Sequence, residues 1–102
     1  MDDKELVEIL MCSDGVRIER ITSRGHVSPE GFWYDQVEDE WVALLKGSAV
    51  LGFDDGSETK LSAGDTLYIP AGRRHRIIYT SVDPECVWFC VFTGRGVTNN
   101  VC

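Results

Sequence analysis

The sequence predicts an all-β fold, either an antiparallel sandwich or a small barrel. Short apolar runs recur at near-regular spacing, Gly and Pro turn signals separate them, and almost no segment has the periodicity of a helix. Chains with this organisation usually form two packed sheets or a closed barrel, and a closed barrel leaves no unpaired strand edge.

Seven expected strands follow one another along the chain. They cover residues 16–18, 40–45, 49–53, 59–61, 66–69, 76–80 and 87–92. Residues 54–57, Asp-Asp-Gly-Ser, have the composition of a hairpin turn, since Gly and Asp tolerate positive φ angles. Pro70 ends the strand before it, because proline cannot donate a hydrogen bond to a sheet. Residues 4–11 fit a helical turn and a strand about equally well.

Composition indicates one ordinary globular domain over residues 1–102, with 43% hydrophobic and 26% charged residues. The net charge of -7 and the pI near 4.6 oppose binding to nucleic acid, which depends on Lys and Arg, and also to anionic membrane surfaces. No apolar run approaches the ~20 residues of a membrane-spanning helix. The first residues also lack the charged and apolar segments of an export signal, so we expect a cytoplasmic protein.

Two segments place chemically useful residues at regular spacing. In the second segment, Gly64, Pro70, Gly72, His75 and Tyr79 follow the pattern Gly-x5-Pro-x-Gly-x2-His-x3-Tyr. The Pro and Gly would turn the chain at a barrel rim, so that His75 enters the next strand. A period of two then places Tyr79 on the same strand face as His75.

In the first segment, Tyr34, Gln36 and Glu40 precede Gly47. The three polar residues all have even numbers, so in an extended chain they would project from one face into the barrel. Asp35 would then point outward.

Together these segments resemble the paired motifs of the cupins, over residues 34–79. The cupin pattern has His at the positions of Tyr34 and Gln36, and Asn at that of Tyr79; the remaining motif positions match. The resemblance implies a single-domain antiparallel cupin barrel of the double-stranded β-helix or jelly-roll type. It also implies that metal ligands, where present, would be Tyr34, Gln36, Glu40 and His75.

These substitutions weaken the implied metal site. An amide oxygen is a poorer donor than imidazole, and a phenol must lose its proton to bind strongly. We expect at most a weak site for a divalent ion, with Mn, Fe or Zn favoured by the oxygen-rich donors.

Glu40 and His75 are the expected catalytic residues. Glu40 lies in an apolar run, so an inward carboxylate there needs a partner to offset desolvation. His75 has three open interpretations: a buried histidine hydrogen-bonded to Glu40, a metal ligand, or a general acid or base without metal. Tyr34 and Gln36 are either polar groups of a pocket or barrel fillers.

Arginines and aromatic residues supply the candidate substrate contacts. Arg73, Arg74 and Arg76 surround His75, either as a solvated face or as a site for an anionic group, with Arg73 the best candidate. We expect Trp33 in the core, in a dimer contact or lining a pocket. Tyr79 completes the expected substrate-binding set, through its shared face with His75.

Three functions remain open at this point. The first is a pocket for a small oxygen-rich or carboxylated molecule with a weak divalent metal, catalysing oxygenation, isomerisation or lyase chemistry. The second is a metal-free, non-catalytic cupin that binds or senses a metabolite. The third is a structural dimerisation module with a filled barrel. The resemblance also predicts a homodimer.

Overall fold

The structure is a computed structural model that describes residues 5–94, and every regular element in that part of the chain is a β-strand. The strands in chain order are β1 (Leu6–Ser13), β2 (Val16–Ser23), β3 (Asp39–Lys46), β4 (Ser48–Phe53), β5 (Glu58–Ser62), β6 (Thr66–Ile69), β7 (His75–Thr80) and β8 (Cys86–Thr93). In this part of the chain there is no helix of the length and apolarity needed to cross a membrane.

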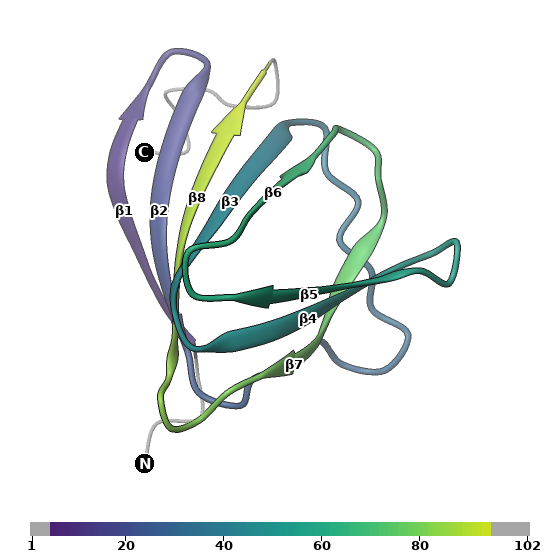
Figure 1. The fold of residues 1–102 in the computed structure, drawn as a ribbon. Helices are drawn as coiled ribbons and strands as arrows, with labels where there is room; N and C mark the ends of the chain where they lie inside the picture. The colour runs from purple at the N-terminus through teal and green to yellow at the C-terminus, as the bar shows by residue number, and fades with distance from the viewer. Residues whose placement is uncertain (1–4, 95–102) are drawn as a thin grey trace.

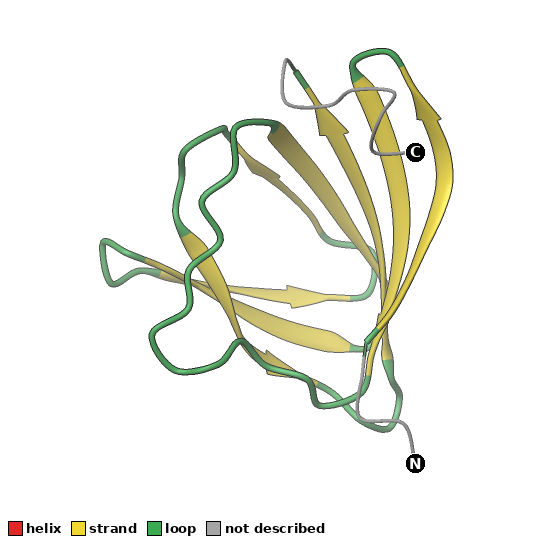
Figure 2. Cartoon of the chain, turned by 180° about the vertical axis from the view of Figure 1, so that it is seen from behind, coloured by secondary structure: helices red, strands yellow, loops and turns green. Residues whose placement is uncertain are grey.

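The strands form two antiparallel sheets that face each other. One sheet has the order β1-β2-β8-β3-β6 and the other has the order β5-β4-β7. Figure 1 shows the smaller sheet crossing in front of the lower part of the larger one, and Figure 2 shows from behind how both enclose a common interior. The expected all-β fold of antiparallel sheets is confirmed.

The core lies between the sheets, where alternate side chains of each strand point inward. On β8 the even-numbered residues are buried, from Cys86 to Phe92, and on β3 the buried positions are Glu40, Val42 and Leu44. This alternation follows from the period of two in a strand with one buried face. The neighbouring strands therefore present Glu40 and Phe92 to the same interior, as their direct pairing requires.

All seven expected strands are present, and residues 6–11, within the segment left open between helix and strand, belong to β1. β1 pairs with β2 along its whole length, which continues the larger sheet. The one substantial difference in length is β2, which extends to Ser23, whereas the sequence predicts a strand over residues 16–18 only.

A β-bulge in β7 changes which residues face the interior. Leu51 pairs with Ile77, but its neighbour Val50 pairs with Tyr79, so Ile78 is an extra residue. Thr80 is consequently buried and Tyr79 is 48% exposed, on the outer face with Val50. The expected sharing of one face by His75 and Tyr79 is therefore corrected, because the bulge inverts the alternation between them.

The chain passes from β3 to β4, and so from one sheet to the other, at Gly47. Its φ of 87° lies in the left-handed region, and a Cβ there would lie 2.7 Å from both Glu85 O and Ser81 Oγ. Ser81 fixes this corner, since its Oγ accepts a hydrogen bond from Ser48 N at 3.0 Å and donates one to Pro84 O at 2.6 Å. Only glycine fits this crossing without displacing the backbone around it.

Candidate functional site

A cavity of about 270 Å³ lies between the two sheets, inside the barrel. Apolar and aromatic side chains make most of its wall. Its polar groups come from different strands and loops. The side chains around it include Glu5, Arg17, Glu19, Tyr34, Gln36, Glu40, His75, Ile77, Trp88, Cys90 and Phe92.

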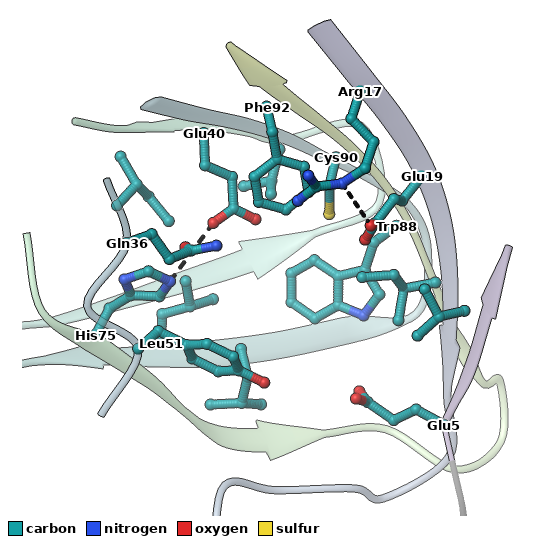
Figure 3. Close-up of a pocket in the computed structure, with 16 residues that line it drawn as sticks. Glu5, Arg17, Glu19, Gln36, Glu40, Leu51, His75, Trp88, Cys90 and Phe92 are labelled. Carbon is teal, nitrogen blue, oxygen red and sulfur yellow. Dashed lines mark hydrogen bonds and ion pairs between the residues drawn. The ribbon is translucent and has the colours of Figure 1, made fainter. Parts of the chain in front are cut away.

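Glu40 and His75 meet at the cavity wall. His75 Nε2 lies 3.6 Å from Glu40 Oε1, and the residues are 4% and 8% exposed, with His75 the more buried. Strand β3 supplies Glu40 at its second residue and β7 supplies His75 at its first. Figure 3 shows the two side chains pointing toward each other, with Gln36 beside the contact.

The surroundings of His75 keep its imidazole protonated to a higher pH than usual. Burial lowers its pKa, but the interaction with Glu40 and the hydrogen bond between Nδ1 and Arg73 O raise it, and the net pKa lies above the ordinary value. The Nδ1 to Arg73 O distance is 2.9 Å. Because a carbonyl can only accept, Nδ1 carries a proton and Nε2 is the nitrogen that exchanges one with Glu40.

Tyr34 packs directly on this pair. Its ring stacks on the His75 ring with a centroid distance of 5.3 Å and an interplanar angle of 23°. Two backbone hydrogen bonds, Tyr34 N to His75 O at 2.7 Å and His75 N to Tyr34 O at 3.1 Å, fix the two residues side by side. Burial, together with Glu5 and Glu40, raises the pKa of Tyr34, so the phenol stays protonated.

Only two of the four expected metal positions, Glu40 and His75, carry a carboxylate or an imidazole. Tyr34, Gln36, Glu40 and His75 all line the cavity, but in the described part of the chain no three His, Cys, Asp or Glu side chains converge on one point. The protonated phenol of Tyr34 is a poor ligand, and a protonated His75 has no lone pair on Nε2 with which to bind a cation. This donor set fits a proton-carrying pair better than a divalent ion.

A second charged group, absent from the predicted site, lies across the cavity. Arg17 is buried; its Nε donates to Glu19 Oε2 at 2.9 Å, and its guanidinium carbon lies 4.4 Å from the centroid of the Phe92 ring. Figure 3 shows Arg17 and Glu19 on the opposite side of the cavity from His75. The predicted strand over residues 16–18 includes Arg17 but ends before Glu19, so their shared odd-numbered face did not stand out in the sequence.

Trp88 and Cys90 complete the wall on β8. Trp88 is 5% exposed and lines the cavity. Burial, followed by the nearby Glu40 and Glu19 carboxylates, raises the pKa of the Cys90 thiol well above its usual range. The thiol is therefore protonated and unreactive, as expected for a small core residue.

The predicted substrate contacts lie outside the cavity. The Arg73 guanidinium carbon lies 3.8 Å from the Phe53 ring centroid and the side chain is exposed; Trp33 is half-buried between Arg74 and Arg76, each 5.8 Å from its ring centroid. Tyr79 faces outward. The cavity lining that the sequence did not predict includes Arg17 and Glu19 on β2 and Trp88 on β8, and outside the cavity Phe53 and Trp33 lie against arginines.

Comparison with known protein families identifies the family of this chain. The family model described as the cupin domain matches residues 24–92. The chain belongs to the cupin family. None of the curated protein sequences compared with this cupin matches it.

Several solved structures are similar to this chain over most of its length. A protein from Ralstonia eutropha, provisionally named a mannose-6-phosphate isomerase, is 37% identical with a TM-score of 0.87, covering 92% of this chain and 88% of that chain. A cupin superfamily protein from Desulfitobacterium hafniense is 22% identical, with a TM-score of 0.78 over 93% of this chain and 82% of that one. An RmlC-like cupin from Methanocaldococcus jannaschii, with a double-stranded β-helix fold, is 21% identical with a TM-score of 0.72, covering 90% and 82%.

Proposed function

We propose that this cupin binds a small polar molecule inside its barrel, without a resident metal, and that Glu40 and His75 exchange a proton with it. One observation carries the proposal: the buried contact of 3.6 Å between His75 Nε2 and Glu40 Oε1 at the wall of a 270 Å³ cavity. A buried acid and base with a displaced pKa, aimed into a cavity, are the usual elements of a proton-transfer site.

The chemistry follows from the protonation states. The imidazolium of His75 would donate the proton on Nε2 to an oxygen of the ligand, and the carboxylate of Glu40 would accept one from a neighbouring hydroxyl or carbon. Such paired transfers suit isomerisation and lyase chemistry. The name of the Ralstonia eutropha protein supports an isomerase-type reaction for this chain as well.

The third hypothesis, a dimerisation module with a filled barrel, receives less support. The described cavity is open to a ligand and carries buried polar groups that a purely structural core does not need. A homodimer, a cytoplasmic location and a single domain over residues 1–102 stay predictions. The homodimer can be tested by substituting Trp41 and its strand partner Tyr68. Both are exposed aromatic residues on the outer face of the larger sheet.

Arg73 and Trp33 are proposed contacts for any part of a ligand that projects beyond the cavity. Arg73 is two residues from His75, and Trp33 precedes Tyr34, which stacks on that histidine. Truncation of either residue would then weaken ligand binding without abolishing it, since the cavity itself would be unchanged.

The test combines ligand binding with metal analysis. We expect a thermal-shift screen of sugars, sugar phosphates, amines and carboxylic acids, run in EDTA, to raise the melting temperature for at least one compound. Glu40→Gln and His75→Asn should reduce that shift, whereas the control Glu58→Gln, which removes an exposed carboxylate outside the cavity, should not. Incorporation of solvent deuterium at a carbon of the ligand, lost in Glu40→Gln, would establish the proton transfer, because a deuteron placed on oxygen exchanges back into solvent.

Two results would contradict the proposal. The first is stoichiometric metal in protein purified without chelator that is lost in both Glu40→Ala and His75→Ala, because this result would show that the two residues bind a metal. Binding without deuterium incorporation, unaffected by either substitution, would leave only a binding domain.

A further inference from the structure

A second hollow adjoins the cavity and shares part of its wall. This hollow has a volume of about 400 Å³, and the loop that includes residues 26–29 forms one side of it. The residues that line both spaces are Glu5, Val7, Tyr34 and Ile77. These side chains therefore stand at the boundary where a ligand in one space would reach the other.

Among the carboxylates of the cavity, Glu5 differs in its partner. Glu19 is paired with Arg17 at 2.9 Å and Glu40 with His75 at 3.6 Å. Glu5 Oε2 accepts a hydrogen bond of 2.6 Å from Ser23 Oγ, a neutral group whose residue is completely buried. Within residues 5–94 no cationic side chain forms an ion pair with Glu5.

The charge balance of the cavity follows from these pairings. Three carboxylates face Arg17 and a histidine, and Arg17 also lies 3.9 Å from Glu38 Oε1 outside the cavity wall. The interior is therefore negative whichever protonation state His75 adopts. An anionic ligand would be repelled, whereas a cation would meet the carboxylate of Glu5, which no cationic side chain among residues 5–94 pairs with.

We propose that the cavity selects ligands with a cationic, ammonium-type group, which binds beside Glu5 where the two hollows meet. Tyr34 at this boundary adds an aromatic ring that favours a cation. The inference rests on the proposed small-molecule function and narrows its ligand class. It also replaces the carboxylated ligand that the sequence suggested.

The test uses three probes of one shape that differ in charge. Cyclohexylamine is protonated at neutral pH, cyclohexanol is neutral, and cyclohexanecarboxylate is an anion. Binding is followed by NMR through the indole N–H of Trp88, which lines the cavity, with Trp88→Phe to assign the signal. We expect the ammonium to bind about tenfold tighter than the alcohol, as for one charged hydrogen bond, and the carboxylate to bind weakest.

Glu5→Gln should remove the preference for the ammonium while leaving the affinity for the alcohol unchanged. The Gln amide oxygen can still accept the Ser23 hydrogen bond, which preserves the fold. Glu58→Gln is the matched control, because it removes the same charge from an exposed site that does not line either hollow. The preference should persist in that variant.

The possible failures are distinguishable. If the alcohol binds in the cavity as tightly as the ammonium, or the carboxylate binds best, the charge assignment is overturned and small-molecule binding stands. A preference that survives Glu5→Gln overturns the assignment to Glu5. If none of the three probes perturbs the Trp88 signal, both the inference and the binding function are overturned.

Discussion

His75 Nε2 and Glu40 Oε1 lie 3.6 Å apart inside the barrel, although the two residues belong to different sheets and are far apart in the sequence. β3 and β7 bring them together only because the sheets face each other. The pair is therefore a property of the closed fold, and its energetics can be tested independently of any ligand.

The titration of His75 should reveal this pairing. We expect an NMR-monitored pKa above 6.5 in the wild-type protein, because the contact with Glu40 outweighs burial. In Glu40→Gln the burial effect is no longer opposed by a charge, so the pKa should fall. The chain has two histidines, and His75→Asn assigns the signal. A pKa unchanged by Glu40→Gln would contradict the pairing.

The raised pKa of His75 also predicts how stability depends on pH. A folded-state pKa above the unfolded value stabilises the protein fully below about pH 6.5, and this contribution is lost as pH rises through the folded-state pKa. The loss is about 1.4 kcal/mol for each pH unit that separates the folded-state and unfolded-state pKa values. The difference in unfolding free energy between wild type and His75→Gln should therefore shrink as pH rises. Urea unfolding at several pH values measures it, and a difference independent of pH would argue against a raised pKa.

Adjacent leucines on β3 should respond very differently to truncation. Leu44 is completely buried between the sheets, whereas Leu45 is 49% exposed. Leu44→Ala should cost about 2–5 kcal/mol of unfolding free energy through lost burial and the cavity left behind. Leu45→Ala should cost no more than about 0.5 kcal/mol. Equal losses in chemical denaturation would show that the inward and outward faces of β3 are assigned incorrectly.

The sheet crossing at Gly47 should tolerate no side chain. Gly47→Ala combines a positive φ with contacts of 2.7 Å to Glu85 O and Ser81 Oγ. Gly64→Ala, with φ of 97° but nothing within 4 Å of its Cβ, carries the backbone strain alone, about 1 kcal/mol. Thermal unfolding should therefore show a clearly larger loss for Gly47→Ala. If both variants melt alike, the close contacts at the crossing are relieved without cost.

Most of the fold could be predicted from local signals in the sequence. Turn residues such as Pro70 mark strand ends, and apolar runs such as residues 87–92 mark the strands between them. β2 was predicted too short, because its inward positions include the charged Arg17 and Glu19, which a pattern of apolar residues does not detect. Their burial depends on pairing with each other, and that is visible only in three dimensions.

The candidate site likewise contains residues that the sequence locates and residues that it does not. Glu40 and His75 could be located from motif spacing, since both lie at the beginning of strands that regular turns position. Glu5 could not, because its role depends on β1 being a strand and on a hydrogen bond from Ser23 in the neighbouring strand. Tyr79 shows the opposite difficulty: the period of two is reliable only until a bulge interrupts it.

That bulge, at Ile78, has a consequence for how this strand can change. The Ile78 side chain covers Gly52 on the outer surface, where a Cβ on Gly52 would lie 2.5 Å from Ile78 Cδ1. Deleting this extra residue would leave Ile77, Tyr79 and Thr80 paired with Leu51, Val50 and Ala49 in a regular register, so Tyr79 would still face outward and Thr80 inward. Over evolutionary time, a single-residue deletion at the bulge is therefore the change in length that β7 should accept most readily.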